Sequence, residues 1–342
     1  MNKIDNFTAV LPVTCNANCN FCPEKEMSDK LKKDEYIQRL IESLAYTKSE
    51  GYDHVSISGG EPTIDLRFLA KVVTSIKNDS HIKRVGITSN GKFLSSMGSM
   101  QKFFDITGEL SFINVSMHSF DRVRNNKIMN VDNQFTVYDV IRFFEFAIKN
   151  NPILTCHVNM VVTEDTLNEL SDNVKFWVEQ VLPYLMKNDL NVNLVIRKDY
   201  DLDKSGFVGT MASIGRNVLG SNPQLISECP TCKTMYHAEE MVYFKYSDYE
   251  PTSNEDTNRE LILHMDGTLS YDWQREKPYL GVIGKFTDGN HTFLDWDRFA
   301  KNRKIINIVT VVPKKTKTPN VKKQEKVIES YSNGCHFSSC GF

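Results

Sequence analysis

Apolar and polar positions alternate over the first two hundred residues in a pattern that predicts strands followed by helices. Six apolar runs have the length of buried strands, and we expect strands at residues 7–13, 54–58, 83–88, 112–117, 152–162 and 191–196. Apolar residues at helical spacing predict helices near residues 34–45, 64–77, 96–104, 134–149 and 166–185. This alternation favours an α/β fold in which helices cover a parallel sheet.

The alternation breaks near residue 199. Residues 199–228 contain four glycines and Pro223, which predicts a loop-rich linker. We expect a short helix at residues 234–241 and a β-hairpin at residues 261–271, with its turn at Asp266-Gly267. These changes divide the chain into a domain of residues 1–200 and a smaller C-terminal domain of residues 201–342.

Composition and charge narrow the class of protein. The 342 residues are 40% hydrophobic and 25% charged, with a net charge of −2, which does not favour nucleic acid as a partner. No apolar run approaches the ~20 residues of a membrane span, and the first residues lack the apolar segment of a signal peptide. We therefore expect a cytoplasmic protein without a membrane partner. Residues 301–326 hold nine Lys or Arg against one acid; they form a solvated linker or recognise an acidic substrate, a nucleotide phosphate or RNA.

Three cysteines follow the first predicted strand. Cys15, Cys19 and Cys22 have the spacing C-x3-C-x2-C, and one loop can place three such thiolates on three irons of a [4Fe–4S] cluster. The fourth iron then has no protein ligand, and an open metal position is where a substrate or cofactor binds. A structural zinc loop and chance clustering are the alternatives.

This spacing, with Phe21 before the third cysteine, resembles the radical S-adenosylmethionine (SAM) superfamily. Residues 59–62, Gly-Gly-Glu-Pro, follow the second predicted strand and are similar to the family motif that holds the SAM amino group. The resemblance covers about residues 7–200 and implies a partial (β/α)6 TIM-like barrel. It implies that the three cysteines ligate a [4Fe–4S] cluster that cleaves SAM to a 5'-deoxyadenosyl radical. It also implies an electron donor such as flavodoxin or ferredoxin.

The same resemblance implies further site residues at the mouth of the barrel. The SAM-binding candidates are Gly59, Gly60, Glu61, Pro62, Ser89, Asn90, Ser116 and Asn159. His118 is a candidate catalytic residue, because a histidine at a catalytic mouth can orient a substrate or shuttle a proton. Each of these residues also has an ordinary interpretation as a turn, a helix cap or a structural polar group.

Four more cysteines lie in the C-terminal region. Cys229 and Cys232 form a C-x2-C pair, and Cys335 and Cys340 form a C-x4-C pair. The two pairs resemble the auxiliary-cluster extensions called twitch or SPASM domains, which implies a second [4Fe–4S] cluster. Spacing alone also allows zinc or two independent pairs of free thiols. Closing the loop between the pairs costs about 4 kcal/mol, and a structural metal contributes roughly 10–16 kcal/mol, so a metal could hold the tail.

The resemblance implies an enzyme that abstracts hydrogen from a substrate, and we expect a peptide or natural-product precursor. A nucleotide or small metabolite is the alternative substrate, and a non-enzymatic iron–sulfur or zinc module is the alternative class. Many peptide-modifying relatives carry a leader-binding domain before the barrel. The first strand is expected near residue 7, which weakens the interpretation as a peptide-modifying enzyme but leaves it open.

Overall fold

The fold was analysed in a computed structural model that describes residues 6–22, 24, 30–228, 232–247 and 260–270, together with three short C-terminal strands. All six predicted strands are present in the predicted order, with ends within three residues of the predicted ones. They are β1 (Asn6–Leu11), β2 (His54–Gly59), β3 (Arg84–Ser89), β4 (Phe112–Ser116), β5 (Thr155–Val162) and β6 (Val192–Lys198). Each pairs in parallel with the next.

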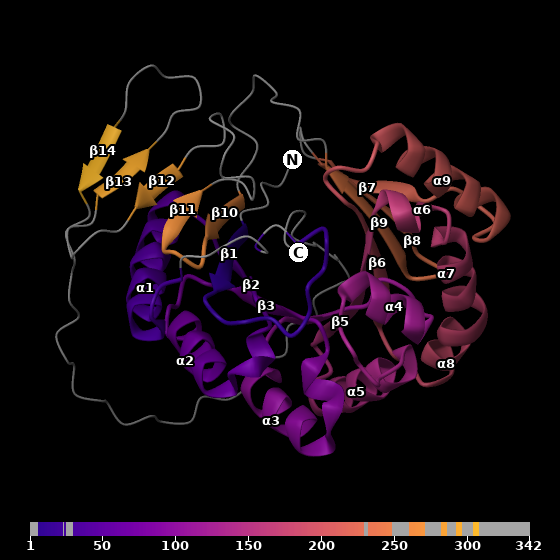
Figure 1. The fold of residues 1–342 in the computed structure, drawn as a ribbon, viewed down its shortest axis with the longest axis horizontal. Coiled ribbons are helices and arrows are strands. Elements are labelled where there is room, and N and C mark those ends of the chain that lie inside the picture. The colour runs from indigo at the N-terminus through magenta and orange to yellow at the C-terminus, as the bar shows by residue number, and fades with distance from the viewer. Residues whose placement is uncertain are drawn as a thin grey trace, which may run out of the picture.

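Helices cover the outer side of this sheet, which curves into the open arc seen in Figure 1. They are α1 (Lys33–Glu50), α2 (Leu66–Lys77), α3 (Met97–Thr107), α4 (Arg122–Met129), α5 (Val137–Asn150), α6 (Glu164–Leu167), α7 (Leu170–Phe176), α8 (Leu182–Lys187) and α9 (Lys204–Asn217). Because helices lie on one face and side chains fill the other, β1 is buried at every residue. The predicted α/β fold with a partial barrel is confirmed.

Two features of the helical layer differ from the prediction. The helix expected at residues 166–185 is divided into α6, α7, a π-helical turn (Trp177–Val181) and α8. Helix α4 was not predicted, because its sequence RVRNNKIM has no apolar stripe. Within the described residues, no helix is long and apolar enough to cross a membrane.

Strands of the C-terminal region extend the sheet at both ends. At one end β9 (Val242–Ser247) pairs in parallel with β6, followed by β8 (Cys232–His237) and β7 (Gln224–Glu228). At the other end β10 (Glu260–Leu263) pairs in parallel with β1, followed by β11 (Thr268–Ser270), β12 (Val282–Lys285), β13 (Thr292–Asp295) and β14 (Lys304–Asn307). The division of the chain at residue 200 stays a prediction.

Two predictions for this region were wrong and one is confirmed. The expected linker contains α9, a helix that tolerates Gly206 and Gly209 in its interior and packs Phe207 into the core. The first half of the helix expected at residues 234–241 belongs instead to strand β8. Pairing with β9 and a stack of Tyr236 on Tyr243 outweigh the local helix propensity of this segment. The predicted hairpin is present as β10 and β11.

Candidate functional site

The loop that follows β1 carries Cys15, Cys19 and Cys22 to the carboxyl end of the sheet. Their side chains line one pocket, here called the cysteine pocket, together with the ends of β2 to β6. Its lining comprises Cys15, Ala17, Cys19, Phe21, Cys22, Glu24, Ser58, Gly59, Gly60, Glu61, Thr88, Ser89, Asn90, Ser116, His118, Met129, Asn159, Val161 and Arg197. The pocket thus gathers every site residue expected in the barrel except Pro62.

Among the described residues that line this pocket there is none of the four C-terminal cysteines. Cys232 begins β8, but its side chain lies outside the described residues, as do Cys229, Cys335 and Cys340. Pro62 is buried one residue beyond Glu61, where it begins a short 3-10 helix of residues 62–64. It therefore shapes the loop rather than lining the cavity.

Hydrogen bonds to sulfur test whether the cysteine loop fits an iron–sulfur cluster. The Sγ of Cys15 accepts from the backbone N–H of Ala17 at 3.4 Å and from Nδ2 of Asn90 at 3.6 Å. Partial removal from water raises the pKa of the Cys15 thiol, against the lowering by the Ala17 N–H. Donors aimed at a sulfur stabilise a metal-bound thiolate, so the loop fits the cluster. In the described part of the chain, no three His, Cys, Asp or Glu side chains lie close enough to share one metal ion.

Gly59 and Gly60 allow the loop after β2 to pass directly against the loop after β1. A Cβ on Gly59, whose φ is +123°, would collide with the backbone of Leu11. A Cβ on Gly60 would collide with the carbonyl oxygens of Val13 and Thr14, in the segment that leads to Cys15. The glycines are therefore needed for contact between two protein backbones, and they set the position of the cysteine loop.

Glu61 joins its own loop to the loop after β3 through its carboxylate, which is 1% exposed. Its Oε1 accepts from the backbone N–H of Thr63 at 2.9 Å, from Oγ1 of Thr63 at 2.6 Å and from Oγ of Ser89 at 2.8 Å. Its Oε2 accepts from the backbone N–H of Asn90 at 2.6 Å. Burial raises the pKa of Glu61, and these hydrogen bonds oppose that rise. Three residues expected to contact SAM thus contact one another.

Asn90 extends this network to the cysteine loop. Its Nδ2 donates to Oδ1 of Asn16 at 2.9 Å as well as to Cys15, and its Oδ1 accepts from the backbone N–H of Lys92 at 3.1 Å. The side chain is therefore held on both sides. Through Asn90, the carboxylate of Glu61 and the sulfur of Cys15 belong to one hydrogen-bonded network.

His118 is buried between the ends of β4 and β5, with 4% of its surface exposed. Its Nδ1 accepts from the backbone N–H of Val161 at 3.0 Å, which leaves the ring proton on Nε2. Burial lowers the pKa of His118 to about 4. A neutral imidazole whose Nδ1 is occupied suits a hydrogen-bond donor, and the catalytic role expected of His118 from the sequence stays a prediction.

Helix α4 supports the same loop, although the sequence pattern did not reveal it. The backbone N–H of Asn18 donates to the carbonyl of Met129 at 2.8 Å, at the end of α4. Asn125, on the same helix, accepts from the backbone N–H of His118 at 2.7 Å. One short helix therefore positions both the cysteine loop and the candidate catalytic histidine.

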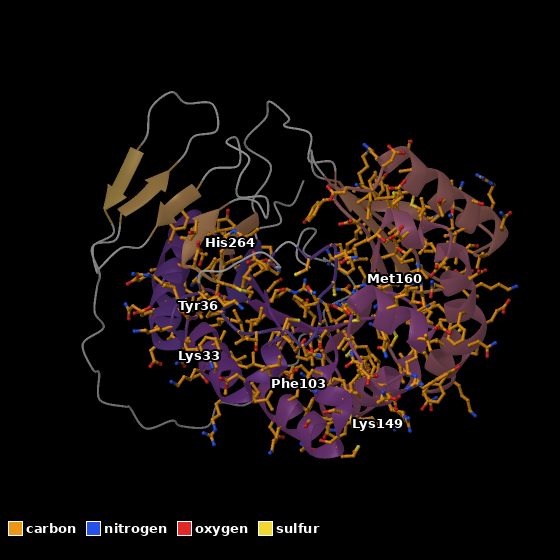
Figure 2. All side chains as sticks on the ribbon, in the orientation of Figure 1. Lys33, Tyr36, Phe103, Lys149, Met160 and His264 are labelled. Atoms are coloured by element: carbon orange, nitrogen blue, oxygen red, sulfur yellow. The ribbon has the colours of Figure 1, made fainter. Side chains whose placement is uncertain are left out.

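A second unpredicted contact joins the cysteine loop to the C-terminal hairpin. Glu24, which lines the cysteine pocket, lies 2.9 Å (Oε1) from Nδ1 of His264. The two side chains are 6% and 0% exposed. Tyr36 lies on the same side of the molecule as His264 in Figure 2. Burial above all, and then the charge of Glu24, raise the pKa of Tyr36. No sequence motif joins residues this far apart.

Comparison with protein families identifies the domain around this pocket. The radical SAM superfamily model matches residues 10–176. The chain carries a radical SAM domain. For this superfamily, a [4Fe–4S] cluster and SAM are the implied cofactors, and the cysteine pocket of the radical SAM domain contains the residues expected to hold them.

Two curated relatives act on nucleotides according to their names. The domain is 32% identical over 150 residues to the S-adenosylmethionine-dependent nucleotide dehydratase RSAD2 of Oncorhynchus mykiss, covering 41% of each chain. It is 30% identical over 180 residues to a probable GTP 3',8-cyclase of Sulfurisphaera tokodaii, covering 52% of this chain and 53% of the relative. The match therefore spans about half of each relative or less.

A solved structure extends the comparison of the fold. Streptococcus suis SuiB, bound to its precursor peptide SuiA, matches with a TM-score of 0.51 and 13% identity, covering 79% of this chain and 59% of that chain. At this identity the likeness concerns the fold alone. It covers a larger share of this chain than the family model, which matches residues 10–176.

Proposed function

We propose that this protein is a radical SAM enzyme in which Cys15, Cys19 and Cys22 hold a [4Fe–4S] cluster and the adjoining loops hold SAM. When bound, cluster and SAM supply the electron and the radical that removes a hydrogen atom from the substrate. The observation that carries the proposal is the convergence of the three cysteines and the residues 59–61 on one pocket at the carboxyl ends of the strands.

The chain's own residues have distinct tasks in this proposal. Ala17 and Asn90 donate to the sulfur of Cys15 and so orient one cluster ligand. Glu61 fixes the loop after β3 and presents a buried carboxylate for the ammonium group of SAM. His118 donates from Nε2 to a ligand acceptor, because its Nδ1 is already occupied.

The test is simultaneous replacement of Cys15, Cys19 and Cys22 by Ala. The triple variant should lose about four irons per chain and all SAM cleavage, since one cluster is removed. Iron content and 5'-deoxyadenosine are measured after anaerobic reconstitution with SAM and dithionite. Cys156→Ala is the matched control, because Cys156 is buried in β5 outside the pocket. Unchanged 5'-deoxyadenosine in the triple variant would disprove the proposal.

We also propose a second cluster on Cys229, Cys232, Cys335 and Cys340, supported by their spacing in the sequence. The reconstituted protein should then hold about eight irons per chain, four for each [4Fe–4S] cluster. Truncation before Cys335 should reduce the content to about four irons and leave the first cluster in place. One zinc with four irons would identify a structural metal, and four irons without zinc would rule out a shared site.

The substrate that we propose is a peptide or natural-product precursor, and an electron donor such as flavodoxin or ferredoxin would supply reducing equivalents. The fold likeness to a peptide-bound structure is compatible with this class. The names of the curated relatives favour a nucleotide instead. A choice between the two requires evidence from the substrate side of the pocket.

A further inference from the structure

A second pocket, of about 340 Å³, opens beside the cysteine pocket. The two pockets share Phe21, whose ring meets the ring of His118 edge-on with centroids 4.8 Å apart. The second pocket has four acidic lining residues, Glu164, Asp165, Asp199 and Asp201. We call it the acidic pocket.

The acidic pocket continues outward from the cysteine pocket along the same two strands. On β5, Asn159 and Val161 line the cysteine pocket, and Thr163, two residues further on, lines the acidic pocket. From β6, Arg197 lines the first pocket and Asp199 the second. A molecule in the acidic pocket would therefore lie next to the site proposed for SAM, where a substrate must lie to be reached by the radical.

Two polar groups that line the cysteine pocket can still form hydrogen bonds with a ligand. Oδ1 of Asn159, on a residue that is 3% exposed, has no hydrogen-bond partner among the described residues. Nε2 of His118 carries the ring proton, since Nδ1 accepts from Val161. Both side chains line the cysteine pocket, so a ligand that spans the two pockets would meet one acceptor and one donor.

The charge of the acidic pocket is not balanced by its basic residues. Arg124 binds Glu169 through Nε at 2.9 Å and through Nη2 at 2.8 Å, so its charge is matched by a residue outside the pocket lining. Lys127 is then the one basic lining residue left against four carboxylates. Partial burial above all, and then the nearby charge of Asp201, raise the pKa of Asp199, against the lowering by the Tyr200 N–H and by the charge of Lys198.

The loop that carries Asp199 and Asp201 is held in place from within. Nζ of Lys198 donates to the carbonyl oxygens of Asp199, Tyr200 and Leu202 at 2.7, 3.2 and 2.6 Å. The ammonium group of Lys198 is thus directed to the loop backbone. The two carboxylates are held at the pocket by an ordered loop, which reduces the entropy lost when a ligand binds.

We propose that the acidic pocket binds the substrate of this enzyme, and that the bound part is a peptide segment carrying an ammonium or guanidinium group. This inference rests on the proposed radical SAM function. Carboxylates attract such cations and repel the phosphates of a nucleotide, so the pocket discriminates between the two substrate classes.

The experiment first measures 5'-deoxyadenosine from the reconstituted wild-type protein, and its absence would refute the proposed function itself. Three probes are then titrated in the presence of SAM: the fluorescein-labelled peptide Gly-Lys-Arg-Gly, its Gly-Glu-Glu-Gly counterpart, and GTP. The basic peptide should bind at least about tenfold more tightly than the others, the effect of one charge-assisted hydrogen bond. Equal affinity for the three probes, or tighter binding of GTP, would overturn the inference.

Variants locate the binding. Asp199→Asn with Asp201→Asn should weaken binding of the basic peptide about tenfold, because two of the four carboxylates lose their charge. Asp105→Asn with Asp172→Asn removes the same charge at exposed helical positions outside both pockets and should leave the affinity unchanged. If both double variants weaken binding equally, the attraction comes from net charge and the acidic pocket is not the site.

Discussion

The loops after β1, β2 and β3 form one wall of the cysteine pocket, and the ends of β4, β5 and β6 form the other. In the first wall the polar groups bind one another: Glu61 accepts four hydrogen bonds from its own loop and from the loop after β3. In the second wall, Oδ1 of Asn159 has no hydrogen-bond partner among the described residues. The His118 ring accepts from the backbone N–H of Val161 at Nδ1 and carries its proton on Nε2.

This difference separates two tasks. A wall that satisfies its own hydrogen bonds has one stable shape, as a fixed cofactor requires. A wall with buried donors and acceptors that still need partners favours the ligands that supply them, as a selective substrate site requires. Substitutions in the first wall should therefore act on stability, on cluster content or on SAM binding, and those in the second should act on ligand selectivity and pH response.

Gly60→Ala should have the largest effect. The added Cβ would collide with the carbonyl oxygens of Val13 and Thr14, so the cysteine loop must move away from its position. We expect loss of most cluster iron, measured after anaerobic reconstitution. Gly98→Ala is the matched control, because a Cβ there meets nothing within 4 Å and should stabilise helix α3 by about 0.5–1 kcal/mol. Full iron content in Gly60→Ala would show that the loop adapts.

His264→Ala should lower the free energy of unfolding by about 3 kcal/mol, since the buried carboxylate of Glu24 loses a hydrogen-bond partner. Urea denaturation of the two proteins measures the difference. His264→Gln retains a polar partner and should recover part of the loss. A decrease in the free energy of unfolding of less than about 1 kcal/mol would mean that the pair contributes no more than a solvent-exposed ion pair does.

Glu61→Ala should weaken SAM binding roughly ten- to a hundredfold, because a charge-assisted hydrogen bond contributes about 1.5–3 kcal/mol. Equilibrium dialysis with SAM measures the loss, and iron analysis should show that the cluster is retained. Ser89→Ala removes one of the four donors and should have a smaller effect. Wild-type affinity in Glu61→Ala would assign the carboxylate a purely structural task.

His118 should give the smallest effect, seen in the pH dependence of stability. Its pKa of about 4 lies below the ordinary 6.5, so the unfolded chain takes up a proton more readily than the folded one. Its contribution to stability is complete above pH 6.5 and declines as the pH falls toward 4. At pH 5.5 the loss is about 1.4 kcal/mol relative to pH 8. Urea denaturation of His118→Asn should show a flatter pH profile than wild type; equal slopes would contradict the assignment.

The sequence predicted the elements that bury continuous apolar runs. Parallel strands covered on both faces leave such runs, so β1 to β6 could be located within three residues. The cysteine spacing also predicted the pocket, because three cysteines within eight residues of one loop lie close together in the fold. In contrast, α4 has no apolar stripe that a sequence pattern could reveal. Strand β8 is stabilised by its pairing with β9, which lies further along the chain.

Contacts between distant residues could not be predicted from one sequence. Glu24 and His264 are 240 positions apart, and nothing local to either marks the other. Glu61 was expected to bind SAM, and the family resemblance could not reveal that its carboxylate also holds Ser89 and Asn90. The acidic pocket could not be predicted either, because only the strand order of the folded sheet brings residues 163–166 and 199–202 together.

The pairing of β1 with β10 has a consequence for the synthesis of the protein. Glu260 pairs with Asn6, so the strand that carries the cysteine loop waits about 250 residues for its second neighbour. At ~5–20 residues per second, β1 is an open edge for roughly 10–50 s while the chain is being made. Exposed edges recruit other strands, so this interval is when the nascent chain is most prone to aggregate. Cluster insertion during that interval would take place in a sheet whose first strand is still open on one side.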